Sequence, residues 1–407
     1  MKKSILFLMF LGVSFVVSGA TVSNVSVTTE ADDIVKITYN LDESSIIMMT
    51  VRTNGAAVAD SSIAHAFGDV RRKVAAGQGT ILWAIDRDLN GVLPNGFTVE
   101  LTPWSLKNPP EVMVVDLRAR NNFTFYRSVD DLPDGGLAND KYRIGYMVMK
   151  KIPMKGVTFL CGNPGTTTGR YAPFLNSFTN DFYFGIYPVT QAQNYTVTGL
   201  TDSEPSTDPE AHLRPVDKIN YDSIRGTSYF WPADGHNVTT GCRLGKFRLL
   251  GLLFDMPTST QWEYACRAGE QGDYYNGKDA SYFDEIGWSS ENGKDAEGNP
   301  VSHPVGHKQP NAWGLYDMLG NVNEWTLDWY RPYEIENRTT ETKVDYPGLP
   351  EGVFYESTDY RVSKTRRGGS VHSSADDFKV YSFSNYNRNA GPYTLNGYRL
   401  CVPAEIP

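Results

Sequence analysis

Arg366–Cys401 reads RRGGSVHSSADDFKVYSFSNYNRNAGPYTLNGYRLC, and this stretch points most directly to the architecture of the chain. Two earlier blocks belong with it: Asn311–Tyr330, NAWGLYDMLGNVNEWTLDWY, and Met256–Gly269, MPTSTQWEYACRAG. They are rich in glycine, asparagine and aromatic residues, a composition typical of loops that bury rings with polar tips. Ser259–Arg267 predicts a helix, because Trp262, Ala265 and Cys266 share a face and Thr258 or Ser259 can cap the first turn. A compact domain with this much irregular chain usually carries its binding or catalytic surface on loops.

Length and charge limit the classes of function. The chain has 407 residues, 38 Lys and Arg against 47 Asp and Glu, and a formal net charge of -9 at pH 7. This length allows two or three domains. The negative balance argues against a nucleic-acid partner, because such proteins normally present a basic patch. A mild acidic excess is typical of a soluble surface and requires no special partner.

The first twenty residues predict a signal peptide. Lys2 and Lys3 form a positive start, the apolar run Ile5–Val17 is too short for a good membrane span, and Ser18–Ala20 supplies small residues for cleavage. We expect cleavage after Ala20 and an exported protein, in the periplasm, at the cell surface or outside the cell. A retained anchor is the alternative. No other stretch is long and apolar enough to cross a bilayer, so no span is expected after cleavage.

Residues 21–105 predict a small all-β domain of the immunoglobulin-like sandwich type. Residues 106–148 predict a connector punctuated by proline and glycine. Residues 149–405 predict the second domain. Expected strands are Ile34–Tyr39, Ile46–Arg52, Thr80–Ile85, Phe97–Leu101, Val112–Leu117 and Ile144–Lys151. A short helix is expected to start at Thr190–Gln191. A strand followed by a helix is expected within Asp217–Gly226.

Cysteine usage leaves two alternatives open. Cys161, Cys242, Cys266 and Cys401 are too few for a disulfide framework in a chain of this length, and no CxxC motif occurs. A bridge between Cys242 and Cys401 is one alternative, and buried free thiols are the other.

Seven blocks in order carry a family resemblance. They are IPMKGVTFLCG, FYFGIYPVTQAQ, RPVDKINY, MPTSTQWEYACRAG, HPVGHKQPNAWGLYDMLGNVNEW, RRGGS and NGYRLC. With these blocks the chain resembles the formylglycine-generating enzyme, or sulfatase-modifying factor, family over roughly 255 residues. The resemblance implies an α+β, loop-rich fold related to C-type lectins for the second domain, with the small all-β sandwich before it.

The same resemblance shows a gap in the chemistry. The family's oxidases hold Cu(I) with two thiolates that follow the RGGS turn, and thiolates suit this soft ion. The matching positions here are Ser373 and Phe378. Because a hydroxyl is a poor Cu(I) ligand and a phenyl ring is none, we expect no copper site and no formylglycine-generating oxidase activity.

The resemblance also implies a calcium site in GNVNEW. The matching ligands are the carbonyls of Leu319, Gly320 and Val322 and the side chain of Glu324, an oxygen set that suits Ca²⁺. The alternative is that Glu324 only accepts hydrogen bonds from neighbouring amides.

Histidine offers a weaker candidate. His372 is next to Ser373, and Asp376 and Asp377 follow, but a buried, hydrogen-bonded His372 is the stronger interpretation. His303 is expected to be an ordinary loop residue.

Three functions remain open. The favoured one is a non-catalytic module that binds a protein or a glycan. The exposed candidates are the loop Tyr381–Tyr393, which is rich in aromatic residues and asparagine, and the insert Trp329–Tyr360. The second is an oxidoreductase of the formylglycine-generating type, or one with non-heme iron, acting on a protein or a small thiol. The third is a structural envelope protein.

Overall fold

The computed structural model describes residues 19–30, 33–90, 96–166, 171–201, 208–330, 342–348, 363–391 and 395–406. The chain divides into two compact units. The first holds residues 1–114, 123–139 and 404–407, and the second holds residues 115–122 and 140–403. The predicted connector, residues 106–148, is therefore shared between the units. Most of the predicted signal peptide lies outside the described residues.

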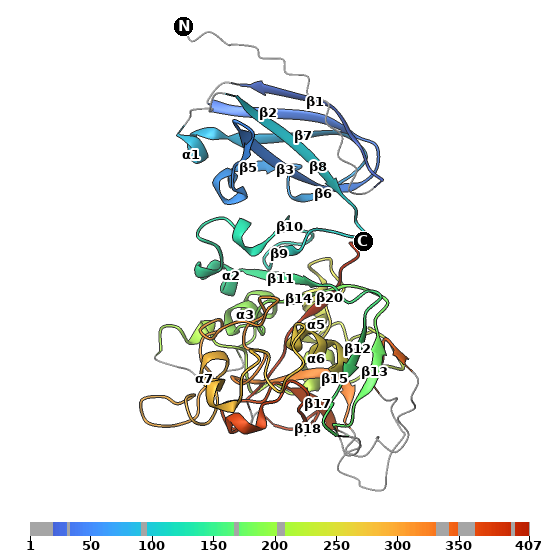
Figure 1. Ribbon diagram of the computed structural model, residues 1–407, viewed down its shortest axis with the longest axis vertical. Helices are drawn as coiled ribbons and strands as arrows, with labels where there is room; N and C mark the ends of the chain where they lie inside the picture. The colour runs from blue at the N-terminus through green and yellow to red at the C-terminus, as the bar shows by residue number, and fades with distance from the viewer. Residues whose placement is uncertain are drawn as a thin grey trace. The chain divides into compact units, whose positions relative to one another are not determined.

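The first unit consists mainly of antiparallel strands (Figure 1). One sheet has the order β1-β2-β7-β5, and in the other β3 pairs with β4, β6 and β8. The elements are β1 Val22–Thr29, β2 Ile34–Leu41, β3 Ser45–Thr53, β4 Ala56–Ala57, β5 Ala66–Gly68, β6 Arg72–Val74, β7 Gly77–Ala84, α1 Ile85–Leu89, β8 Phe97–Trp104, β10 Phe123–Tyr126 and the 3-10 turns Asp60–Ile63, Val129–Asp131 and Gly136–Ala138, with β9 Val112–Asp116 at the division between the units.

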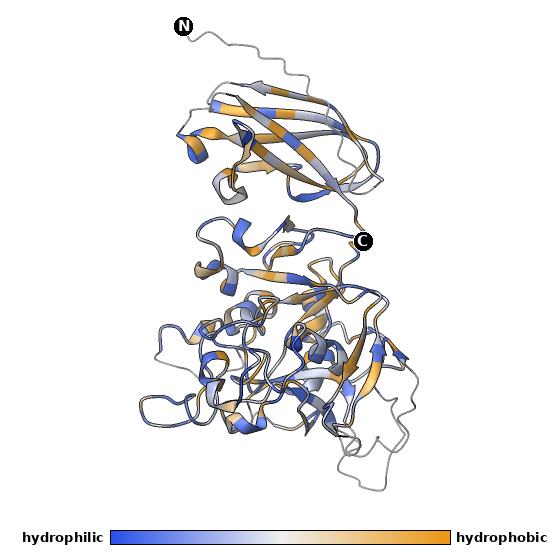
Figure 2. Ribbon diagram, in the orientation of Figure 1, coloured by the Kyte–Doolittle hydropathy of each residue, from blue (hydrophilic) through white to orange (hydrophobic). Residues whose placement is uncertain are grey.

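The two sheets of the first unit share one hydrophobic core. Val35 and Ile37 of β2, Ile47 and Met49 of β3 and Trp83 of β7 are all buried in it. Polar and apolar residues alternate along the long strands, as Figure 2 shows, because successive side chains of a strand point to opposite faces. The strands predicted in this region are confirmed. The immunoglobulin-like topology stays a prediction.

The second unit mixes α and β structure and is rich in irregular chain, which agrees with the predicted fold class (Figure 1). Its strands are β11 Tyr146–Ile152, β12 Thr158–Cys161, β13 Phe174–Ser177, β14 Phe182–Gly185, β15 Asn323–Trp329, β16 Lys343–Val344, β17 Ser363–Arg367, β18 Phe383–Asn387, β19 Asn396–Gly397 and β20 Cys401–Pro403. Its helices are α2 Lys141–Ile144, α3 Gln191–Thr198, α4 Tyr221–Arg225, α5 Arg243–Arg248, α6 Ser259–Arg267 and α7 Phe283–Ile286, with 3-10 turns Ala211–Leu213, Ala280–Tyr282 and Ala375–Asp377.

Two sheets frame the core of the second unit. β14 pairs antiparallel with β11 and β20, and a four-stranded sheet has the order β18-β17-β15-β19. The core joins residues far apart in the sequence, among them Phe159, Trp262, Phe283, Met318 and Phe378. The blocks that looked like loops in the sequence therefore pack together around shared aromatic rings.

Helix α6 begins and ends where local chemistry predicts. The Thr258 side chain accepts a hydrogen bond from Gln261 N, and the Gln261 side chain accepts one from Thr258 N, which is a capping box. The helix ends at Arg267, and the C-cap residue Ala268 is left-handed, with φ of 48°. α3 starts in the same way, at Thr190. The prediction within Asp217–Gly226 was half right, since α4 forms but no strand precedes it among these residues.

All four cysteines are free and buried, so the predicted alternative of a Cys242–Cys401 bridge is not the one observed. Within the described ranges, no helix has the length and apolar character needed to cross a membrane.

Candidate functional site

Phe378, which the family resemblance aligns with the second copper thiolate, lies inside the hydrophobic core. It is 2% exposed, and its ring stacks on that of Phe283 with a centroid distance of 4.7 Å and an interplanar angle of 18°. Gly369 makes room for it: φ is 74°, and a Cβ at this position would stand 1.8 Å from the Phe378 ring. The glycine of the RGGS turn and the phenylalanine therefore fit each other sterically, and the position serves packing.

Ser373, which the family resemblance aligns with the first copper thiolate, lies in a turn held by backbone hydrogen bonds. Its N–H donates to Ser370 O (2.9 Å), and its carbonyl accepts from Ser290 N (2.9 Å). Ala375 N donates to the Glu291 carboxylate (3.3 Å), which ties the same two loops together a second time. The side chain of Ser373 is half-buried. The turn is well supported by its neighbours but offers only a hydroxyl.

The preferred interpretation of His372 as a buried residue was wrong. His372 is exposed, and its backbone N–H donates to Ser370 Oγ (3.4 Å). Asp376 and Asp377, which follow it, are also exposed. Over the part of the chain that the structure describes, no three His, Cys, Asp or Glu side chains are grouped so that they could hold a metal ion. These residues therefore form a polar loop surface.

His303 is half-buried in a ring stack, which differs from an ordinary loop histidine. Its ring lies 3.9 Å from that of Trp288, at an angle of 14°. Burial, together with the nearby charges of Arg214 and Lys308, lowers its pKa to about 4. The imidazole is therefore neutral at physiological pH.

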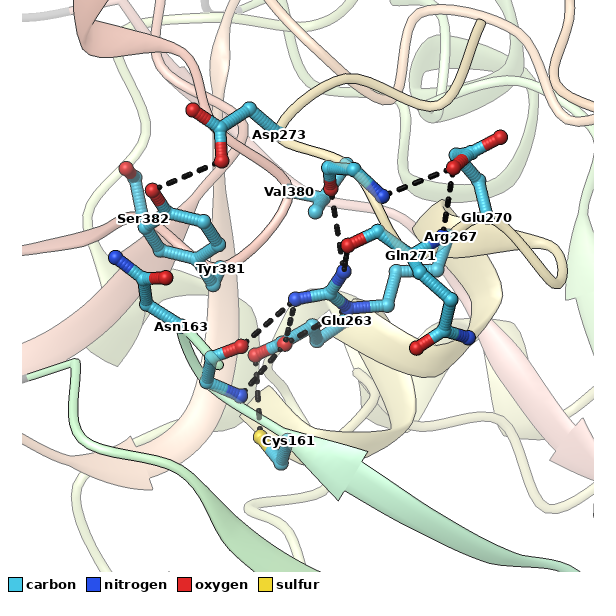
Figure 3. Close-up of polar contacts among 12 residues, drawn as sticks. Cys161, Asn163, Glu263, Arg267, Glu270, Gln271, Asp273, Val380, Tyr381 and Ser382 are labelled. Carbon is cyan, nitrogen blue, oxygen red and sulfur yellow. Dashed lines mark hydrogen bonds and ion pairs between the residues drawn. The ribbon is translucent and has the colours of Figure 1, made fainter. Parts of the chain in front are cut away.

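A buried carboxylate on α6 organises the core beside this loop. Glu263 is fully buried, and its Oε1 accepts from Gly162 N (2.8 Å) and from Nε and Nη2 of Arg267 (3.1 and 3.0 Å). Its Oε2 accepts from Arg367 Nη2 and from the Cys161 thiol, both at 3.1 Å. Figure 3 shows the Cys161 thiol and the Arg267 guanidinium pointing toward this carboxylate. Sequence analysis missed Glu263 because its partners come from distant segments.

Both guanidiniums around Glu263 are fully engaged. Arg267 also donates to the carbonyls of Gln271, Gly272 and Gly162. Arg367 donates to Ser259 Oγ (2.7 Å), Ser382 O (3.2 Å) and Val380 O (3.5 Å). Buried charges with complete hydrogen bonding rigidify a core, so this network serves structure and offers no free group to a substrate.

The network continues to the surface through Tyr381. Its hydroxyl donates to Asp273 Oδ1 (3.1 Å), and Asp273 Oδ2 pairs with Lys379 Nζ (2.9 Å) (Figure 3). Tyr381 is 4% exposed. The start of the segment that the sequence suggested as a binding loop is therefore part of the core.

Further along that segment, Phe383–Asn387 forms β18, which pairs antiparallel with β17. The prediction of a loop over Tyr381–Tyr393 is thus wrong for this part, because edge pairing was invisible in the sequence. Residues 392–394 lie outside the described residues. In the second suggested segment, Trp329 and Tyr330 are buried, and residues 331–341 and 349–360 lie outside the described residues.

The predicted calcium ligands surround one buried turn. Leu319 and Val322 are buried, and Gly320 has φ of 80°, with a Cβ there only 2.3 Å from Trp288 O. Glu324 is 1% exposed and pairs with Arg399, whose Nη2 lies 2.8 Å from Oε1.

The indole N–H of Trp262 also donates to Glu324 Oε2 (2.6 Å). Glu324 is therefore held by a guanidinium and an indole, where the sequence suggested amides as the alternative to calcium. A calcium ion at this turn would share the carboxylate with Arg399.

Asp317 is a further acidic residue of this turn that sequence analysis missed. It is 2% exposed, accepts from Gly306 N (2.8 Å) and Asn321 Nδ2 (3.2 Å), and has φ of 53°. Burial raises its pKa, and the charge of Glu324 adds to the increase. Asp317 and Glu324 are therefore two buried carboxylates that both interact with the Arg399 guanidinium, and carboxylate oxygens are the ligands that Ca²⁺ prefers.

Comparison with known proteins now identifies the scaffold. Residues 146–403 match the sulfatase-modifying factor enzyme 1-like domain, well over half of the chain. The chain belongs to this family. The match covers α6, the buried Glu263 and Glu324 pairs, and the turn that carries Ser373 and Phe378, so the resemblance seen in the sequence blocks is confirmed.

Curated relatives of this sulfatase-modifying factor-like chain differ in kind. It is similar to the chaperone protein LppX of Paenibacillus barcinonensis, with 26% identity over 40% of this chain and 68% of that protein. It is similar to the formylglycine-generating enzyme of Bos taurus, with 32% identity over 24% of this chain and 27% of that protein. An inactive Cα-formylglycine-generating enzyme 2 of Mus musculus shares 30% identity over 30% of this chain and 40% of its own length. The match thus spans about a quarter of the bovine enzyme.

Solved structures similar to this family member include Treponema denticola variable protein 1, with TM-score 0.48, 22% identity, and 63% of this chain and 95% of that chain covered. PvdO from Pseudomonas aeruginosa aligns with TM-score 0.44 and 17% identity over 63% of this chain and 94% of that chain. These scores are low, so the family assignment rests on the sequence match.

Proposed function

We propose that the second unit is a non-catalytic binding module built on the sulfatase-modifying factor scaffold. The packing of Phe378 carries this proposal. Its ring stacks on Phe283 at the position that corresponds to a copper thiolate, and Ser373 takes the other position. Cu(I) requires soft sulfur ligands, and neither residue provides one.

The four cysteines of the chain do not replace the missing pair. All are buried, and burial raises the pKa of the Cys266 and Cys401 thiols well above the ordinary value. Thiols with a raised pKa stay protonated, and it is the thiolate that binds metals and attacks substrates. Copper-dependent oxidation of a protein cysteine is therefore not the function that this geometry supports.

The ligand we propose is a protein or a glycan, held by the polar loop that carries His372, Asp376 and Asp377. These side chains are exposed, and the loop is fixed to its neighbour by the hydrogen bonds from Ser290 and to Glu291. A pre-ordered loop binds at a lower entropy cost than a free one. The similarity to a chaperone and to an inactive formylglycine-generating enzyme also favours binding over oxidation.

Export completes the proposal. The predicted signal peptide would place the mature chain outside the cytoplasm, and the first unit, an immunoglobulin-like sandwich by our interpretation, would act as a spacer or docking domain. A calcium ion at Glu324 and Asp317 would support the turn that precedes β15.

Two measurements test the function. The purified protein, loaded with Cu(I), is incubated with a sulfatase peptide and the peptide is assayed for aldehyde. We expect none, and aldehyde formation would overturn the non-catalytic interpretation. In parallel, the protein is applied to glycan and peptide arrays, with Asp376→Asn/Asp377→Asn as the loop variant and Lys278→Ala as a surface control.

We expect binding that the loop variant weakens at least about tenfold, equivalent to about 1.4 kcal/mol, and that the control retains. Empty arrays of both kinds, or equal binding by both variants, would remove the support for a ligand at this loop.

A further inference from the structure

A second group of buried charges lies away from the loop of Ser373. Asp255 Oδ2 contacts three cationic or titratable side chains: Arg225 Nη2 (3.2 Å), Arg248 Nη2 (3.2 Å) and His236 Nδ1 (2.8 Å). Arg225 ends α4 and Arg248 ends α5. The cluster therefore joins two helices through one carboxylate oxygen.

The charges of this cluster do not balance. The side chains of Arg225 and Asp255 are 1% and 2% exposed, and that of Arg248 is 17% exposed. Two guanidiniums share one carboxylate, whose other oxygen accepts from Met256 N (2.9 Å). The two guanidiniums and the one carboxylate therefore carry an excess of one positive charge. Burying a charge without compensation is unfavourable, so a bound counter-ion is favourable here.

The hydrogen bonds of Arg225 are also incomplete. Its Nη2 donates to Gly235 O (3.3 Å) and Asn237 O (3.1 Å). In the described part of the chain, its Nε and Nη1 are buried and have no hydrogen-bond partner. Buried guanidinium N–H groups nearly always have acceptors, so two without one at a single side chain indicate a missing acceptor.

Neighbouring protein groups do not supply the negative charge. The Tyr221 hydroxyl interacts with the Arg225 guanidinium electrostatically and through a side-chain hydrogen bond, and the Cys242 thiol interacts with it electrostatically. Burial raises the pKa of Tyr221 to about 12 and raises that of Cys242 as well. Both groups are therefore neutral near pH 7.

We propose that a small monovalent anion of halide size binds at the Arg225 guanidinium, between α4 and α5. It compensates the second guanidinium and accepts from an N–H group that the protein leaves without an acceptor. Water could accept the hydrogen bond but could not balance the charge. His236 is 38% exposed, so the cluster reaches solvent on that side and an ion can enter there. This site is independent of the proposed ligand-binding function.

Thermal unfolding in chloride tests the site. The midpoint is measured as sodium chloride replaces sodium gluconate up to 100 mM at constant ionic strength, which keeps screening equal. We expect the wild-type midpoint to rise by roughly 2–4 °C. Arg225→Met, which removes the excess charge, should lose this rise. Asp255→Asn, which leaves both guanidiniums without a carboxylate, should show a larger rise.

A wild-type midpoint that does not change with chloride, or an Arg225→Met protein that keeps the full rise, would overturn the proposal. If either variant fails to fold, crystals of the wild-type protein grown in sodium bromide decide the question. An anomalous bromide peak within contact distance of Arg225 Nε or Nη1 supports the site. A water molecule there, or no peak, contradicts it.

Discussion

Glu263 on α6 and Arg367 on β17 form a buried ion pair, with Oε2 and Nη2 3.1 Å apart, although 104 residues separate them in the sequence. Arg267, one turn further along α6, binds the other oxygen of the same carboxylate at 3.0 Å. This pairing connects the best-defined helix of the second unit to the strand that leads into the RGGS turn. The position of the Ser373 loop therefore depends on a charge that lies deep in the core.

Removing the Glu263 charge should destabilise the protein strongly. Glu263→Gln leaves two buried guanidiniums without a carboxylate, and breaking a buried pair in this way costs about 3–5 kcal/mol. Unfolding in urea, followed by tryptophan fluorescence, measures the change. Lys278→Ala serves as control, because Lys278 pairs with Glu285 at the surface and exposed pairs contribute at most about 1 kcal/mol. Equal stability of both variants would show that the buried pair contributes little.

Restoring a thiol at the second copper position should also cost stability. Phe378→Cys removes a ring from the stack with Phe283, and truncating a buried phenylalanine costs about 3–5 kcal/mol. Ser373→Cys is the matched control at the half-buried first position, where a change within about 0.5 kcal/mol is expected. Both are measured by urea unfolding under reducing conditions. If Phe378→Cys were as stable as the wild type, the core role of this ring would be refuted.

Because of Asp328, we expect the free energy of unfolding to depend on pH in an unusual way. Burial raises its pKa from 3.8 to about 6 in the folded protein. The folded state therefore holds the proton more tightly than the unfolded state, so this contribution is fully present below pH 3.8 and is lost as pH rises through 6. The loss is about 3 kcal/mol.

Asp328→Asn cannot titrate and should lack this loss. The free energy of unfolding of both proteins is compared at pH 4 and pH 7, so that contributions from other groups cancel in the difference. Identical changes with pH in the two proteins would show that Asp328 titrates normally.

Calcium bound at Asp317 and Glu324 should stabilise the second unit. An excess of Ca²⁺ over EGTA should raise the thermal midpoint by roughly 2–4 °C or more, because a ligand that binds only the folded state stabilises it. Mg²⁺ at the same concentration is the control, since it needs a stricter octahedral geometry. Asp317→Asn should remove the effect while it leaves the Glu324–Arg399 pair in place. A thermal midpoint that does not change when Ca²⁺ is added would contradict the calcium proposal.

Elements set by local chemistry could be predicted well. The helix from Ser259 to Arg267 was recognisable because its apolar residues share a face and a threonine or serine stands at its start, and the structure adds a capping box between Thr258 and Gln261. The strand over Ile34–Tyr39 was recognisable because apolar and polar residues alternate along it, which is typical of a strand with one buried face. In contrast, β18 was taken for a loop, because its stability comes from pairing with β17 rather than from its own residues.

For the candidate site, too, some features could be predicted from the sequence and others required the structure. The amino-acid sequence alone determined that no sulfur stands at residues 373 and 378 and that the chain carries the blocks of its family, because residue identity needs no folding. Only the tertiary structure decided that Phe378 stacks on Phe283, that His372 faces solvent, and that Glu324 pairs with Arg399 across 75 residues. Such contacts form only when distant segments pack into one core, because a buried charge is stable only when it is paired and hydrogen-bonded.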